Sequence, residues 1–222
     1  MSSGPLTMST STKKSADIIQ LPTSQMGARV ETVKVVRAAV EKKLSYLMEG
    51  LAYNVAEALF EEMRGMDEQD ALACHFNVMR SLKTQSAELR GNFTALMNKS
   101  WMNTIHRKDK QGVSDAPLDV TPTLKAYSDK NLNHYKVLLE EIRQRFCSLS
   151  RREVAFHPLL PGNFYLCFWH ATESLDLTYQ ERKLLLPLFN RFVMDRFGQV
   201  LSIANQVLID RGVAMWDQRG ER

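Results

Sequence analysis

Apolar residues recur every three or four positions along most of this chain, from about residue 31 to residue 212. This spacing places side chains on one face of an α-helix. In the first stretch the apolar positions form a single line, and most of the charged residues lie off it. The line consists of Val33, Val36, Val40, Leu44, Leu47, Leu51, Val55, Ala58, Leu59 and Met63.

A second stretch with the same period follows after a connection of only a few residues. So short a connection predicts that the two helices pack as an antiparallel hairpin over residues 31–106. The apolar line of the second helix consists of Leu72, Phe76, Met79, Leu82, Leu89, Phe93, Leu96, Trp101 and Ile105.

The pattern breaks at residues 107–121, which are polar, contain Gly and Pro, and are typical of an exposed loop. Further periodic segments predict helices over 122–150, 163–175 and 178–212. Thr178 and Glu181 match the S/T-x-x-E capping box, so Thr178 is expected to open the last helix. Pro187 lies within that helix and predicts a kink or a break near Lys183 to Pro187.

No segment alternates apolar and polar residues as a half-buried strand would. The sequence therefore predicts an all-α fold, a bundle of about five helices with long antiparallel helices. Residues 1–28 are rich in Ser, Thr, Gly and Pro and are expected to form a disordered tail. Residues 29–214 are expected to form a single helical domain, followed by a C-terminal tail over 215–222.

Net charge, cysteine content and the length of apolar runs narrow the range of functions and cellular locations to expect. The net charge of +4 is mildly basic, short of the bias of a dedicated nucleic-acid-binding protein. Three cysteines form no spaced framework and are interpreted as free thiols in a reducing compartment. No apolar run approaches the roughly 18 residues of a membrane helix, and the first residues lack the apolar core of a secretory signal. We therefore expect a cytoplasmic protein with no membrane partner.

The last third of the chain contains HPLLPGNFYLCFWHATESLDLTY, followed by LLLPLFNRFVMDRFGQVLSIANQVLIDRGV. With LMEGLAYNVAEALFEEM and LRGNFTALM nearer the N-terminus, it resembles the N-terminal and central helical region of a bacterial family of unknown function. Members of that family are sometimes labelled thymidine phosphorylase. The shared motifs, over residues 45–214, are apolar and structural. The chain has no glycine-rich phosphate loop and no βα organisation to support that label, and the family offers no catalytic residue that can be placed on this sequence.

Cys167 and His170 are three residues apart in a dense aromatic run. With Cys74 and His75 they could supply the four ligands of a zinc site, although the spacing matches no familiar zinc module. A Cys–His nucleophile would need a lowered thiol pKa, whereas apolar surroundings raise it. We interpret Cys167 as a core residue and predict no metal, no cofactor and no catalytic residue.

Four arginines lie at the end of the helix expected over 122–150: Arg143, Arg145, Arg151 and Arg152. Near a helix C-terminus the helix dipole stabilises such cations without any ligand. The functional interpretation is an anion patch that binds nucleic acid or a nucleotide second messenger.

Trp101 and Trp216 are candidates for contacts with a protein partner, because exposed tryptophans are frequent anchors of interfaces. The leading hypothesis is a non-catalytic helical adaptor or regulator that acts through protein–protein contacts, with a homodimer as one form. The alternatives are a nucleic-acid or nucleotide-binding regulator that uses the arginine patch, and an enzyme of an unrecognised class.

Overall fold

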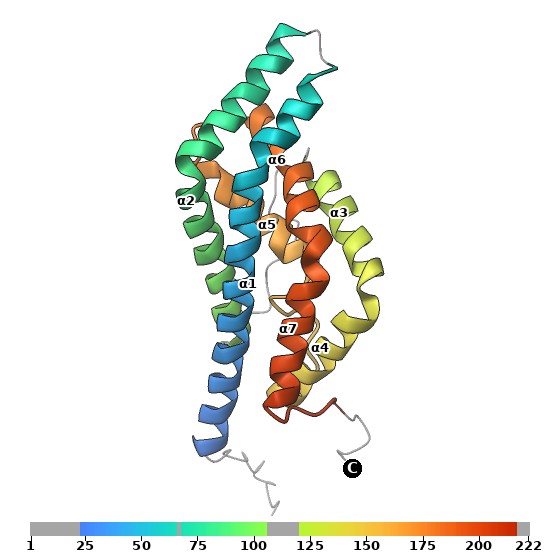
Figure 1. Ribbon diagram of the computed structural model, residues 1–222. Coiled ribbons are helices and arrows are strands. Elements are labelled where there is room, and N and C mark those ends of the chain that lie inside the picture. Colours follow the sequence, from blue (N-terminus) through green and yellow to red (C-terminus); the bar gives the residue numbers. More distant parts are fainter. Residues whose placement is uncertain (1–22, 66–67, 106–119, 217–222) are drawn as a thin grey trace, which may run out of the picture.

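The computed structural model describes residues 23–65, 68–105 and 120–216, and within these ranges it contains helices and no strand. The all-α prediction is confirmed (Figure 1). The helices are α1 Thr23–Met63, α2 Gln69–Ile105, α3 Thr121–His134, α4 Lys136–Ser150, α5 Pro161–Ala171, η2 Thr172–Ser174, α6 Tyr179–Phe192, η3 Met194–Arg196 and α7 Phe197–Asp210.

Helices α1 and α2 are the longest, with 41 and 37 residues, and pack side by side as the predicted hairpin (Figure 1). The apolar line predicted for α1 is buried along its length, with Val33 partly buried. In α2 the described members of the predicted line are buried or partly buried, except Phe76, which is 55% exposed. Val78 and His75 are buried instead, because the period shifts by one residue near the start of α2.

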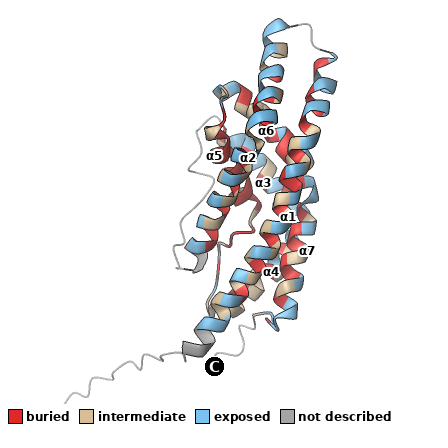
Figure 2. Cartoon of the chain, turned by 60° about the vertical axis from the view of Figure 1, so that its left-hand side comes forward, coloured by how far each residue is buried: buried red, intermediate tan, exposed pale blue. Residues whose placement is uncertain are grey.

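Helix α5 is the most buried element, and it packs against α2, α3 and α6. Every residue from 163 to 169 is buried, and Figure 2 shows buried residues gathered on the inward sides of the surrounding helices. The ring of Phe168 stacks on Phe189 of α6 with centroids 4.0 Å apart. Phe93 of α2 meets these two rings edge-on at 6.4 and 5.8 Å. The aromatic core thus joins the hairpin to the C-terminal helices.

The single helix expected over 122–150 is two helices, and that prediction is wrong. Tyr135 leaves the helical backbone with φ −104° and ψ 19°, which separates α3 from α4. Its ring packs edge-on against Phe197 of α7 at 5.8 Å. A contact with a distant segment therefore fixes the break, and no local helix-breaking residue marks it.

The helix expected over 178–212 is also divided, but not at Pro187. Helix α6 continues through the proline and ends at Phe192, and the chain departs from regular α-helix at Val193 and η3. The expected break near Lys183 to Pro187 is therefore wrong. Val193, Met194 and Phe197 are all fully buried, so the irregular turn directs three apolar side chains into the core. Helix α7 is followed by Gly212, whose φ of 71° glycine adopts without strain.

The predicted capping box at the start of α6 is confirmed. The Glu181 carboxylate accepts the backbone N–H of Thr178 at 2.7 Å, and its other oxygen accepts the amide of Asn77 of α2 at 2.8 Å. Burial alone would raise the pKa of Glu181, but these hydrogen bonds hold it below its ordinary value. The cap therefore also ties α6 to α2.

At the N-terminal end, helix α1 already begins at Thr23, so the expected tail boundary at residue 28 is wrong. Residues 1–22 of the expected tail, residues 106–119, which include most of the loop expected over 107–121, and residues 217–222 lie outside the described residues. Among the helices that are described, none combines the length and the apolarity that crossing a membrane would require.

The contact between Tyr135 and α7 gives a test of the division between α3 and α4. A Cβ at Gly198 would lie 2.8 Å from Cε1 of Tyr135, so Gly198→Ala should lower the free energy of unfolding by about 1–3 kcal/mol. Gly91→Ala is the matched control: its Cβ meets nothing within 4 Å, and it should raise stability by up to about 1 kcal/mol. Urea denaturation measures both changes, and equal effects of the two variants would contradict the assigned contact.

Candidate interaction surface

Three large aromatic side chains lie exposed along one line of α1. Tyr46 is 66% exposed, Tyr53 86% and Phe60 53%. They are seven residues apart, which returns each to nearly the same side of the helix. This line, called here the α1 aromatic face, is separate from the buried line that packs into the core. Helix α1 therefore presents apolar surface on two sides.

A groove of about 430 Å³ adjoins the α1 aromatic face. Its α1 side includes Tyr46 and Tyr53 with Gly50 between them, where a Cβ would meet nothing within 4 Å. The other wall comes from Phe192 at the end of α6 and Arg196 of η3. The hollow over Gly50, between two tyrosines, has a shape that can receive a side chain from another molecule.

Charged residues lie at both ends of the α1 aromatic face. Lys42 and Lys43 lie at the N-terminal end, and the Nζ of Lys43 is 5.0 Å from the ring centroid of Tyr46. Glu57 lies exposed near the other end. Glu49 lies exposed between the two tyrosines, and Arg64 lies beyond Phe60 with its guanidinium 5.5 Å from the Phe60 ring centroid.

Sequence reasoning missed this surface. The aromatic residues lie among polar neighbours off the main apolar line, where single exposed apolar residues are common. The signal that could have found them is their repeated seven-residue spacing in a helix whose opposite side already has a complete apolar line.

The predicted partner-contact tryptophans lie in different environments. Trp101 is 1% exposed, with its ring 6.1 Å from that of Phe146. It is a core residue, so its expected exposed position is wrong. Trp216 is half-buried at the C-terminal end of the described residues, and its contact with a partner stays a prediction. Among the methionines, Met48 and Met97 fill the core.

Two of the four arginines predicted to form an anion patch pair with different residues of the domain. Arg143 forms hydrogen bonds with Glu140 at 2.7 and 2.8 Å. These bonds hold the pKa of Glu140 at about 2 and raise the pKa of Arg143. Arg145 instead donates to Asn205 of α7 at 2.9 Å and to the carbonyl of Val213. Both guanidinium groups thus have partners within the domain.

Arg151 and Arg152 lie where α4 ends. Arg151 has a left-handed backbone with φ 49°, and the backbone N–H of Arg152 donates to the carbonyl of Cys147. The charge of Arg151 acts on Arg29 of α1, whose pKa is lowered first by burial and then by this repulsion. A hollow of about 310 Å³ is lined by Arg29 and by Arg211, which follows α7. The basic group that the fold assembles is therefore Arg29, Arg151 and Arg211.

His157, in the turn after α4, is fully buried and stacks on Phe146 with centroids 5.6 Å apart. Neither ring nitrogen has a hydrogen-bond partner among the described residues. Burial, together with the positive charge of Arg143, lowers the pKa of His157 to about 3. The imidazole is therefore neutral at pH 7, and its protonation opposes folding.

Cys167 and His170 have separate environments. Cys167 is buried, its Sγ lies 3.8 Å from Oδ1 of Asn163, and burial raises its pKa to about 12. This supports the interpretation of Cys167 as a core residue. Near the start of α2, His75 is buried with Nε2 3.6 Å from a carboxylate oxygen of Glu62. No group of three or more His, Cys, Asp or Glu side chains suited to a metal occurs in the described part of the chain.

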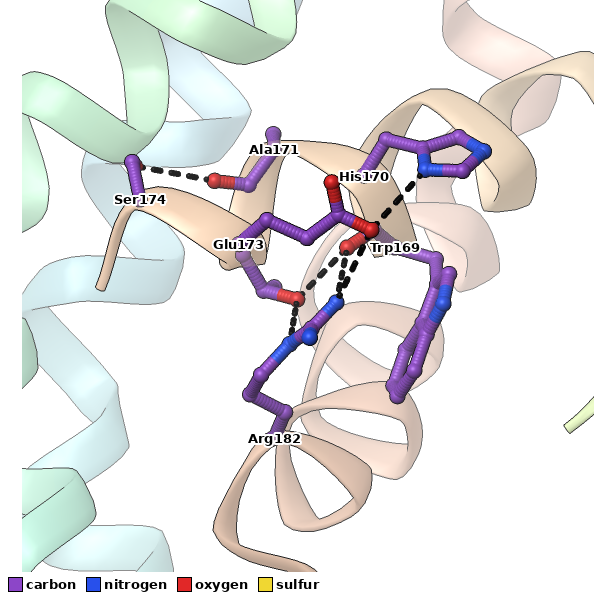
Figure 3. Close-up of polar contacts among 7 residues, drawn as sticks. Trp169, His170, Ala171, Glu173, Ser174 and Arg182 are labelled. Carbon is purple, nitrogen blue, oxygen red and sulfur yellow. Dashed lines mark hydrogen bonds and ion pairs between the residues drawn. The ribbon is translucent and has the colours of Figure 1, made fainter. Parts of the chain in front are cut away.

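His170 belongs to a polar cluster at the C-terminal end of α5 (Figure 3). Its Nδ1 lies 3.1 Å from Oε1 of Glu173. Arg182 of α6 donates to the Thr172 hydroxyl at 3.0 Å and to the Trp169 carbonyl at 3.2 Å, with its guanidinium 4.3 Å from the Trp169 ring centroid. Arg182 thus donates to one of the last carbonyl groups of α5, a region where a helix leaves carbonyls without helical partners. The cluster anchors α5 to α6.

These features define an all-helical bundle domain whose longest helix presents an aromatic face to solvent. The chain belongs to the family described as protein of unknown function (DUF1631), N-terminal domain, whose model matches residues 30–212. The family resemblance stated from the sequence is confirmed. Comparison with the curated proteins and with the solved structures gave no match.

The buried His157 predicts a specific pH dependence of stability. Its pKa is about 3 in the folded chain and about 6.5 when unfolded, so the unfolded chain binds the proton first. The stability contributed by the neutral ring is complete above pH 6.5. It is lost as the pH falls, by up to about 1.4 kcal/mol per pH unit.

His157→Phe should flatten this loss between pH 6.5 and pH 5 when urea denaturation is followed at each pH. His170→Gln is the control, because His170 lies at the surface beside Glu173, and it should keep the wild-type slope. The assignment fails if His157→Phe loses stability with falling pH as steeply as the wild type does.

Proposed function

We propose that this domain is a non-catalytic adaptor or regulator that binds a protein partner through the α1 aromatic face. The observation that supports the proposal is the exposure of Tyr46, Tyr53 and Phe60 on one line of a helix whose opposite side is already buried. Within the described part of the chain, the core is complete without these three rings.

The chemistry of the face suits protein recognition. Tyrosine brings a large, rigid apolar ring together with a polar hydroxyl and loses little conformational entropy on binding, so it is enriched at interfaces. The face repeats every seven residues, which is the spacing at which one helix packs along another. The adjoining groove between α1 and Phe192 extends the surface that a partner helix would contact.

The proposal predicts a selective weakening of binding on substitution. Tyr53→Ala should weaken partner binding by about tenfold or more, because a central aromatic anchor contributes on the order of 2 kcal/mol. Its unfolding free energy should change by less than about 0.5 kcal/mol, since the side chain is 86% exposed. Val137→Ala removes a 75% exposed apolar side chain from α4 and is the matched control.

Quantitative crosslinking and mass spectrometry in the source cell would compare the proteins held by the wild type and by the two variants. We expect at least one protein that crosslinks to the wild type and to Val137→Ala but not to Tyr53→Ala. If all three chains hold the same proteins in the same amounts, the α1 aromatic face is not the binding surface.

A second candidate function is the binding of a phosphate-bearing ligand, such as a nucleotide or nucleic acid. The observation that favours it is the hollow lined by Arg29 and Arg211, together with the repulsion between Arg29 and Arg151. An anion placed there would relieve that repulsion. Thr32 and Ser148 also line the hollow and offer hydroxyl groups to a phosphate.

This alternative predicts that Arg29→Gln weakens the binding of a nucleotide panel, measured by calorimetry, and that added salt weakens wild-type binding. Lys125→Gln, which removes an exposed cation from α3, should leave binding unchanged. Equal binding by the wild type and Arg29→Gln at low salt would exclude this hollow as the site.

A further inference from the structure

We infer that the partner of the α1 aromatic face is a second copy of this chain, paired antiparallel along α1. The inference rests on the proposed function, because it identifies the occupant of the same face. It is supported by the order of residue types along α1, which is complementary to its own reverse.

The exposed line of α1 follows a heptad pattern of alternating four- and three-residue steps. Its members are Lys42, Tyr46, Glu49, Tyr53, Ala56 and Phe60, and all of them are exposed. Every second member is aromatic, and the members between are charged or small. An antiparallel pair of such helices places each aromatic position opposite one of the positions between.

With the two-fold axis near residue 51, each aromatic ring meets a suitable partner. Phe60, whose ring centroid is 5.5 Å from the guanidinium of Arg64 in the same chain, lies opposite Lys42 of the second copy, whose methylene groups can pack on the ring. Tyr53 lies opposite Glu49 of the second copy, where the phenol hydroxyl can donate to a carboxylate that Arg90 of the same chain already holds in place. Tyr46 lies opposite Ala56 of the second copy, whose small side chain leaves room for the ring.

The flanking positions agree with the same register. Lys43, Gly50 and Glu57 each follow a member of the exposed line by one residue and therefore flank the contact on one side. In the antiparallel pair, Lys43 of one copy lies beside Glu57 of the other. Gly50 then faces Gly50 across the axis, where the open space beside it allows the helices to approach closely. Ala52 lies on the other side of the seam and is also small.

Charge selects the antiparallel arrangement over the parallel one. A parallel pair would place Lys42 beside Lys42 and Glu49 beside Glu49, both like charges, and would leave Lys43 and Glu57 on opposite edges of the contact. The antiparallel pair replaces the outer contacts by two Lys–Glu pairs. A helix from an unrelated protein would need the same order of charges, whereas a second copy has it by symmetry.

The length of the contact between the two α1 helices indicates how tightly the dimer should bind. From residue 42 to residue 60 the helix rises about 27 Å, so the contact lies near the lower end of stable interfaces. We expect a reversible dimer with a dissociation constant in the micromolar range.

Sedimentation equilibrium of the full chain, from micromolar to near-millimolar concentration, tests the inference. The wild type should form dimers, and Tyr53→Ala should weaken them about tenfold or more. Lys43→Glu and Glu57→Lys should each weaken the dimer several-fold. The double variant Lys43→Glu/Glu57→Lys should recover most of the affinity, because it restores opposite charges across the axis. Val137→Ala should dimerise as the wild type does.

A monomeric wild type at every concentration would overturn the inference, as would a dimer that all variants form equally well. A double variant weaker than either single variant would overturn the antiparallel register. Thermal unfolding followed by circular dichroism would confirm that each variant is folded, which is expected because Tyr53, Glu57 and Val137 are exposed and Lys43 is only partly buried.

A photo-crosslinking benzoylphenylalanine in place of Tyr53 separates failure of this inference from failure of the proposed function. In a mixture of isotope-labelled and unlabelled copies, a crosslink between copies to residues near Glu49 supports the dimer. A crosslink in cells to a different protein, with no crosslink between copies, overturns the dimer but leaves the adaptor proposal. No crosslink to any protein overturns both.

Discussion

Helix α5 holds the two halves of the domain together through its burial. Its aromatic side chains lie against α2, α3 and α6, and the stacked pair Phe168 and Phe189 with Phe93 joins the hairpin to the C-terminal half. A helix buried on nearly every side must satisfy its polar ends inside the protein. At the C-terminal end Arg182 and Thr172 both donate to the Trp169 carbonyl. Near the other end the Asn163 side chain donates to the Pro158 carbonyl and so ties the preceding turn to α5.

Helix α1 packs into the bundle with only one of its sides. Helix α1 packs against α2, α6 and α7 with one line of apolar residues, and its opposite side stays in solvent. On that side Tyr46, Tyr53 and Phe60 repeat with a helical period and are flanked by opposite charges. The other candidate residues have structural roles. Cys167 and His157 are buried in the core, and Arg143 and Arg145 have partners within the domain.

Much of the fold could be predicted from the chain alone, because burial of one helix face imposes a periodic pattern on the sequence. The hairpin, the capping box of Thr178 and Glu181, and the helical class follow from such local rules. The breaks at Tyr135 and Val193 could not be predicted. Tyrosine and valine are both compatible with a helix. At these two positions the backbone departs from the helix, and the side chain packs against segments that are far away in the sequence. The break expected at Pro187 is absent, since α6 continues through the proline to Phe192.

The residue order was enough to predict which segments form helices and which side of each helix is apolar, because these depend on spacing within one segment. It was not enough to predict which apolar residues remain exposed. Trp101 and Tyr53 are both aromatic residues in long helices, yet one is buried and the other is 86% exposed. The packing of the helices distinguishes them, because burial depends on which other helices lie against each side, and contacts between segments far apart in the chain set that arrangement.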